Sequence, residues 1–176
     1  SSWEDVVPTG APGEDQDRTV RVVDPVRSST GLGTLYLLHG ALQESSQDAD
    51  TFNAHMTAAL QSLHQGASAD EEAAFLALSG GDAEAPPLMV MSEQAVWRYN
   101  TLHSEAPAQA GYLDSTYYLD YPYVVRSEES AVTRAAEEFR NAVRADENQE
   151  HFQSEGFRDT DDTMDSDVLT ADTGFQ

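Results

Sequence analysis

Five consecutive apolar residues, Pro87-Leu88-Met89-Val90-Met91, have no polar residue among them. A strand with one face in water alternates polar and apolar side chains, whereas this run is typical of a strand covered on both faces. The run Thr19-Val20-Arg21-Val22-Val23 also predicts a strand. It stops at Asp24-Pro25, because proline has no backbone donor and restricts the residue before it. Strands separated by helices predict an α/β domain with a parallel or mixed sheet flanked by helices.

The helices are predicted from apolar residues spaced three and four apart. One helix follows Ser28-Ser29-Thr30-Gly31, a short one surrounds residues 148–154, and the others span about 48–63, 70–78, 92–99 and 128–145. The helix at 128–145 is the longest and most amphipathic, and we expect one face of it to be buried. That face comprises Val132, Ala135, Ala136, Phe139 and Val143.

The charge balance argues against nucleic acid as a partner. Asp and Glu number 32 and the nine basic residues are all arginine, so the formal net charge is −23 and the pI is about 4.1. Phosphate backbones need clustered cations, and carboxylates repel them over a Debye length. The absence of lysine excludes P-loop and Schiff-base chemistry. The most economical interpretation of the acidity is a well-solvated surface.

Cofactor and metal chemistry find little support in the sequence. The chain has no cysteine, which excludes disulfides, thiolate metal sites and cysteine nucleophiles. Its five histidines show no paired metal spacing, and no G-x-S-x-G nucleophile turn occurs. We therefore predict no metal site, no cofactor and no enzymatic activity. A serine, an imidazole and a carboxylate converging within hydrogen-bond reach would revive an enzyme hypothesis.

The chain contains no stretch of about 20 apolar residues and no basic-then-apolar leader, so we expect no direct membrane insertion by this segment. Any signal or anchor would lie outside it. The cysteine count alone assigns no compartment.

The turn from Asp24 to Gly31 is the strongest candidate site. Its ligand-binding residues would be Arg27, Ser28, Ser29, Thr30 and Gly31. A helix start leaves N–H groups without intrahelical partners and favours negative charge, so an anion or polar ligand suits it. Simple N-capping by Ser28 or Ser29 is the alternative and needs no ligand.

A second turn, at Ser92 and Glu93, offers further contacts if it lies beside the first, although both residues would also serve as helix-start residues. The tyrosines of residues 117–123 would form either a stacking wall or half-buried strand positions.

Residues 159–176 are predicted to be an acidic tail or linker after a domain that spans residues 1–158. From Asp159 onward the segment holds six Asp and no basic residue. It fails the EF-hand pattern, because Met164 stands where glycine is required and Thr170 where a bidentate Glu is required. We expect the segment to be mobile unless it docks through Val168, Leu169 or Phe175.

Three ordered blocks resemble the second half of bacterial extracellular solute-binding proteins of the type 2 periplasmic-binding-protein superfamily. The first is Trp3-Glu4-Asp5-Val6 followed by residues 22–32, VVDPVRSSTGL. The second is residues 89–100, MVMSEQAVWRYN. The third is residues 119–125, LDYPYVV, then Ala135-Ala136-Glu137-Glu138-Phe139 and the close Phe152-x-x-x-Gly156-Phe157-Arg158. The subgroup is the one whose members often carry a von Willebrand factor A domain.

The resemblance implies a periplasmic-binding-protein-like lobe, with the C-terminal return, from a two-lobed protein at the cell surface. It implies a non-catalytic function, the delivery or sensing of a small solute, with a membrane transporter or cell-surface protein as partner and a lipoprotein anchor outside this chain. Residues 28–31 would face the ligand, with Ser92 and Glu93 as further contacts. A secreted interaction or adhesion module that has lost its ligand is the alternative. Neither the identity of the solute nor the oligomeric state follows from the sequence.

Overall fold

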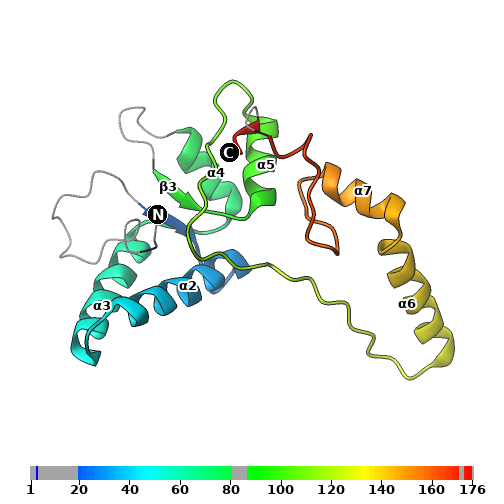
Figure 1. The fold of residues 1–176 in the computed structure, drawn as a ribbon, viewed down its shortest axis with the longest axis horizontal. Helices are drawn as coiled ribbons and strands as arrows, with labels where there is room; N and C mark the ends of the chain where they lie inside the picture. Colours follow the sequence, from blue (N-terminus) through cyan, green and yellow to red (C-terminus); the bar gives the residue numbers. More distant parts are fainter. Residues whose placement is uncertain (1–2, 4–19, 81–86, 171–172, 176) are drawn as a thin grey trace. The chain divides into compact units, whose positions relative to one another are not determined.

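The protein is represented by a computed structural model, which describes residues 3, 20–80, 87–170 and 173–175 (Figure 1). The chain forms two compact units. The first unit comprises residues 1–92 and 112–119, and the second comprises residues 93–111 and 120–176. Within the described residues there are six α-helices and one parallel sheet of three strands, so the predicted α/β fold with a sheet flanked by helices is confirmed.

The sheet of the first unit is purely parallel. β1 (Val20–Val23) lies in the middle, between β2 (Ala67–Ser68) and β3 (Leu88–Val90). Val22 pairs with Ala67 on one side and with Val90 on the other. Since all three strands run in the same direction, their carboxyl ends meet at one edge of the sheet.

Among the described residues, three helices longer than one turn belong to the first unit (Figure 1), and each starts at a side-chain cap. α2 (Ser29–Ser45), α3 (Ala49–Gln65) and α4 (Glu71–Ser79) are capped by Ser28, Asp48 and Asp70, whose side chains accept a backbone N–H three residues on. These caps satisfy donors that the first helical turn leaves unpaired. The predicted helix ranges of 48–63 and 70–78 agree with the structure.

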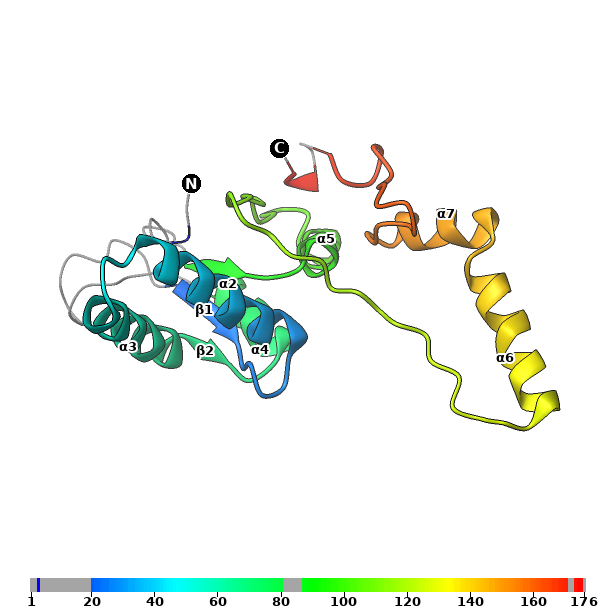
Figure 2. The same ribbon diagram turned by 60° about the horizontal axis from the view of Figure 1, so that its bottom comes forward.

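The main core lies between the sheet and the pair α2 and α3 (Figure 2). Val20 and Val22 point into it from β1, and Leu38 and Leu42 from α2 are fully buried against them. Because side chains alternate across a strand, Val23 faces the other side of the sheet. α4 contacts β1 and β2 and buries Ala74 and Phe75, in agreement with a helix on that second face.

Two glycines let backbone and an aromatic ring approach α2 closely. A Cβ on Gly31 would overlap the Val23 carbonyl oxygen and lie 2.9 Å from the Pro25 nitrogen, and a Cβ on Gly33 would overlap the ring of Tyr117. Gly31 therefore allows the first turn of α2 to rest on the end of β1. Gly33 makes room for the segment of residues 112–119 to cross the helix.

The second unit contains α5 (Glu93–Leu102), α6 (Ser130–Val143) and α7 (Asp146–Ser154). Its buried apolar residues are Ala95 and Tyr99 on α5, with Leu169 and Phe175 from the predicted acidic tail. Leu169 and Phe175 are two of the three residues through which docking was expected, and they tie residues 159–175 to this unit. Polar contacts add to this packing, since the buried Asn100 amide donates to the carbonyls of Ala108 and Thr173 and accepts from the Ala108 amide.

The predicted buried face of α6 is wrong. No residue of α6 is buried, and Phe139 and Val132 are 58% and 45% exposed. Within the second unit the elements against α6 are α7 and Tyr123, whose ring centroid lies 5.8 Å from that of Phe139. Amphipathic spacing identifies the side of a helix that suits burial, and here no layer of the described unit covers that side.

Replacing Gly31 and Gly40, which both lie in α2, by alanine should have opposite effects on the stability of the first unit. Gly31→Ala forces α2 away from Val23 and should destabilise the first unit by about 1–3 kcal/mol, as overpacking does. Gly40→Ala meets nothing within 4 Å and should stabilise it by about 0.5–1 kcal/mol, the difference in helix propensity. Urea unfolding followed by circular dichroism measures both, and equal effects of the two substitutions would contradict the close approach at Gly31.

Candidate functional site

The turn between β1 and α2 is built around Asp24. Its carbonyl oxygen accepts the amides of Arg27 and Ser28 at 3.0 and 2.9 Å, and its carboxylate Oδ1 accepts the Val26 amide at 2.9 Å. The Asp24 amide in turn donates to the Ser68 carbonyl at the end of β2. Asp24 and Pro25 therefore end the strand and also fix the turn that presents Arg27 and Ser28.

Ser28 is the N-cap of α2, as one of the two sequence hypotheses for this turn expected. Its Oγ accepts the Gly31 amide at 3.4 Å. Next to it, the amides of Ser29 and Thr30 belong to the first helical turn, which offers them no intrahelical acceptor. Capping by Ser28 satisfies the Gly31 amide, and the Ser29 and Thr30 amides remain at the positive end of the helix dipole.

The five predicted ligand residues of this turn differ in exposure. Arg27 and Ser29 are exposed, Ser28 and Thr30 are half-buried, and Gly31 is buried against β1. Among the described residues, no carboxylate forms an ion pair with Arg27. The turn can thus offer a guanidinium, a hydroxyl and two amides to an anion or a polar solute, with Gly31 as the buried support.

Tyr117 is a part of this region whose position could not be derived from the sequence. Its hydroxyl donates to the Ser29 carbonyl at 2.9 Å, and its ring lies against Gly33. The sequence offers the tyrosine run as a stacking wall or as half-buried strand positions, and one of its members lies beside the start of α2. The missing information was the partner, because Tyr117 and Ser29 are 88 residues apart.

Ser92 leaves the same edge of the sheet as this turn. β1 and β3 are parallel neighbours in which Val22 pairs with Val90, so Ser92 continues β3 at the level where Asp24 continues β1. The structure thus brings the second predicted turn to the carboxyl edge that carries the first. Ser92 and the turn of residues 24–31 belong to the first unit.

Glu93 begins the second unit and binds Arg158 there. Arg158 donates from Nε and Nη2 to the two Glu93 carboxylate oxygens, both at 2.8 Å. This bidentate geometry is the strongest form of an arginine–carboxylate pair. Close by, Gly156 has a φ of +81°, and a Cβ there would lie 2.7 Å from the Trp97 ring. The packing of Gly156 against Trp97 and the ion pair of Arg158 with Glu93 therefore hold residues 156–158 against α5.

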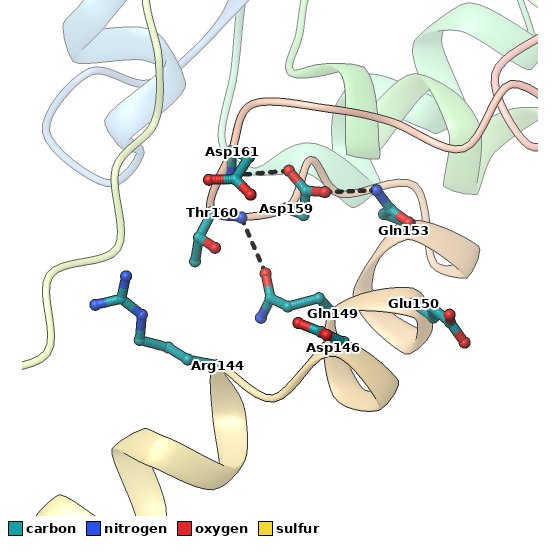
Figure 3. Close-up of a pocket in the computed structure, with 8 residues that line it drawn as sticks. All are labelled: Arg144, Asp146, Gln149, Glu150, Gln153, Asp159, Thr160 and Asp161. Atoms are coloured by element: carbon teal, nitrogen blue, oxygen red, sulfur yellow. Dashed lines mark hydrogen bonds between the residues drawn. The ribbon is translucent and has the colours of Figure 1, made fainter.

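A small cavity of about 200 Å³ lies between α7 and the loop that follows Arg158 (Figure 3). Its lining combines Arg144 with the carboxylates of Asp146, Glu150 and Asp161. Gln149 and Gln153 reach the loop from α7: Oε1 of Gln149 accepts the Thr160 amide, and Nε2 of Gln153 donates to Asp159 Oδ2. These contacts hold the loop to the helix and account for much of the polar lining.

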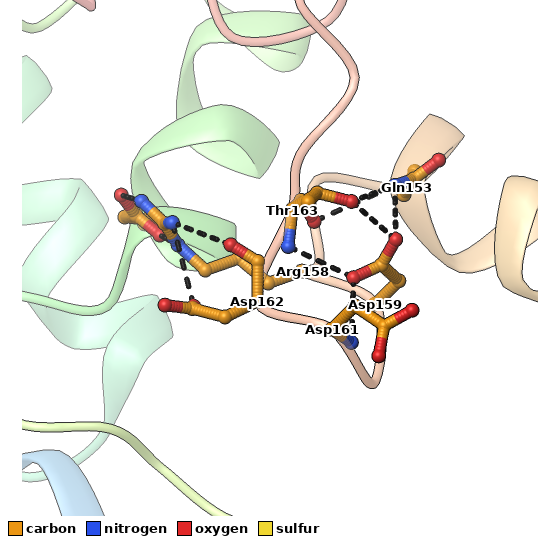
Figure 4. Close-up of polar contacts among 7 residues, drawn as sticks. Gln153, Arg158, Asp159, Asp161, Asp162 and Thr163 are labelled. Atoms are coloured by element: carbon orange, nitrogen blue, oxygen red, sulfur yellow. Dashed lines mark hydrogen bonds and ion pairs between the residues drawn. The ribbon is translucent and has the colours of Figure 1, made fainter.

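Asp159 organises that loop (Figure 4). Its Oδ1 accepts the amides of Asp161 and Thr163 at 2.9 and 2.8 Å, while Oδ2 accepts Gln153 Nε2 and the Thr163 hydroxyl. Hydrogen bonds from the hydroxyl and then the amide of Thr163 lower the pKa of Asp159 below its usual 3.8. A carboxylate has about four lone-pair positions, and these four donors occupy them.

In the described part of the chain, no three His, Asp or Glu side chains gather as a metal ion would require. None of its helices has the length and apolarity needed to cross a membrane.

Comparison of the chain with family models, curated proteins and solved structures found no match. The resemblance to solute-binding proteins therefore stays a prediction.

Arg158 and Glu93 should be energetically coupled. A double-mutant cycle with Arg158→Gln and Glu93→Gln isolates the pair, and at 30% and 24% side-chain exposure we expect a coupling of about 1 kcal/mol. Urea unfolding of the four proteins measures it. The matched control is the cycle Arg134→Gln with Glu138→Gln on the exposed surface of α6, which should show a smaller coupling energy. Equal coupling energies in the two cycles would contradict the role of Arg158.

The Asp159 loop should open in acid. Because hydrogen bonds depress the folded-state pKa of Asp159, its contribution to stability is complete above pH 3.8 and is lost as the pH falls through the lowered folded-state value. The amide resonances of Asp161 and Thr163 should shift together in that range. In Asp159→Asn they should show no such titration, and the same acid shift in this variant would show that another group opens the loop.

Proposed function

We propose that the chain is a non-catalytic binding unit for a small polar or anionic solute, held at the turn between β1 and α2. The observation that carries this proposal is that Arg27, Ser29 and the first amides of α2 belong to one turn, in which Arg27 and Ser29 are exposed. This turn lies at the carboxyl end of the middle strand of a parallel sheet, where such folds commonly bind ligands. Ser92 lies at the same edge and is the next residue that a bound solute could contact.

Charge makes the expected binding local. The chain carries −23, and Asp24 lies within the turn, so the long-range field repels an anion. Affinity must come from short hydrogen bonds with amides and the guanidinium, which act in contact and are little affected by distant charges. Glu93 stays a predicted contact, while its bond to Arg158 supports a structural role.

The ordered blocks described above support the same function class. On that resemblance the protein acts outside the cell or at its surface and hands its solute to a membrane transporter or a cell-surface protein. The turn of residues 24–31 coincides with the block that the resemblance assigns to the ligand. The two arguments have different origins, one in sequence order and the other in hydrogen-bonding geometry.

Titration calorimetry with phosphate, sulfate, molybdate and small sugars tests the proposal. An oxyanion should bind, and Arg27→Gln should weaken it about tenfold or more, because a charge-assisted hydrogen bond contributes about 1.5–3 kcal/mol. A sugar should be weakened mainly by Ser29→Ala. Arg134→Gln, an exposed arginine of α6, is the control and should leave affinity unchanged. Absence of heat with every ligand, or equal loss in the control, would contradict the proposal.

An interaction module is the second candidate, and the exposed apolar surface of the second unit favours it. Tyr121, Val124 and Phe139 are 75%, 71% and 58% exposed. Large apolar side chains that are exposed on one unit commonly mark protein contacts where they gather into a patch. A chain that binds no solute in the titrations but self-associates at high salt, with the association lost in Phe139→Ser, would favour this alternative.

A further inference from the structure

A second site lies away from this turn, on the solvent face of α2. An open groove of about 470 Å³ runs beside the helix within the first unit. The lining residues on which its chemistry depends are Trp3, Tyr36, Gly40, Ala41, Glu44 and Asp114.

Gly40 is one of the residues that line the groove. Tyr36, Gly40 and Glu44 are four residues apart and form one row along α2. A Cβ on Gly40 would meet nothing within 4 Å, so no packing constraint requires a glycine there. Glycine inside a helix costs about 0.5–1 kcal/mol relative to alanine. Close contacts require glycine at positions 31 and 33. At Gly40 no contact does, and the missing side chain leaves an unfilled notch in the row between Tyr36 and Glu44.

The opposite wall is held in place by the segment of residues 112–119. The Trp3 indole is buried and its Nε1 donates to the Ser115 carbonyl at 3.0 Å. Two residues on, Tyr117 is fixed to α2 through Ser29. Asp114 is therefore carried by a segment that is pinned on both sides, and the groove exists without any ligand to shape it.

The lining has a definite chemical preference. Among the described residues that line the groove, the charged side chains are the carboxylates of Glu44 and Asp114. Tyr36 is 73% exposed and offers its ring, and Ala41 with Leu37 supplies an apolar floor. Carboxylates attract ammonium groups, and aromatic faces attract cations and apolar bodies alike.

From these features we propose that the groove binds a small organic cation with an apolar body, of the arylalkylamine class. The ammonium group meets Glu44, and the apolar body lies over Gly40 and Ala41 against Tyr36. This site is independent of the proposed solute site, since it has the opposite charge preference and uses none of residues 27–31.

Three ligands separate the contributions to binding. Titration of the chain with phenethylammonium chloride should give saturable binding. Neutral 2-phenylethanol and ammonium chloride should each bind at least about tenfold more weakly than phenethylammonium does. In NMR spectra the Trp3 indole resonance should move with saturation, whereas that of Trp97, in the second unit, should not. If 2-phenylethanol bound as tightly as phenethylammonium, the groove would hold only the apolar body; if ammonium bound as tightly, it would hold only a counter-ion. Either result overturns the proposal.

Variants test the geometry without disturbing the core. Glu44→Gln removes a charge, Tyr36→Ala removes the ring, and Gly40→Leu fills the notch while favouring the helix; each should weaken phenethylammonium about tenfold or more. Glu72→Gln on α4 and Tyr121→Ala in the second unit change residues of the same types at exposed positions and should have no effect. Circular dichroism verifies folding. Wild-type affinity in folded Gly40→Leu, or equal losses in the controls, would overturn the proposal.

Discussion

The contact between the first turn of α2 and the end of β1 determines most of what the first unit presents to solvent. It exists because residue 31 has no side chain, so the helix can rest on the Val23 carbonyl. This places Leu38 and Leu42 over the sheet and leaves Ser28 and the first amides at its carboxyl edge. One turn later the helix turns the row that begins at Tyr36 toward solvent. A helix lying farther from the sheet would supply neither the same core nor the same turn.

The two proposed sites show why net charge is a poor guide to local chemistry. The whole chain carries −23, yet the start of α2 combines an exposed guanidinium with amide donors, while the groove beside the same helix carries carboxylates. Charges farther away than a Debye length, about 8–10 Å at ordinary salt, contribute little. Hydrogen-bond geometry at contact then decides which ion is bound. The overall charge instead governs solubility and the approach of large polyanions.

Local patterns in the sequence were enough to predict β1, β3 and most helix ranges and to offer Ser28 or Ser29 as a cap, because each depends on neighbours along the chain. The two-residue strand β2 was not predicted, since Ala67-Ser68 has no periodicity and becomes a strand only by pairing with β1. The positions of Tyr117 against Ser29 and of Arg158 against Glu93 depend on residues 88 and 65 apart. Such contacts are set by the fold, and no spacing in the sequence encodes them.

The second unit is stabilised in a different way from the first. The first buries aliphatic side chains of β1, α2 and α3 around one sheet, whereas the buried apolar residues described in the second are few and the face of α6 is exposed. Polar contacts compensate: the Arg158–Glu93 pair and the Asn100 amide join segments distant in sequence, and the carboxylate of Asp159 holds the loop around it. Ionic contacts of this kind weaken with salt and acid, while aliphatic burial does not. The two units should therefore open separately, with the second opening at the lower free energy.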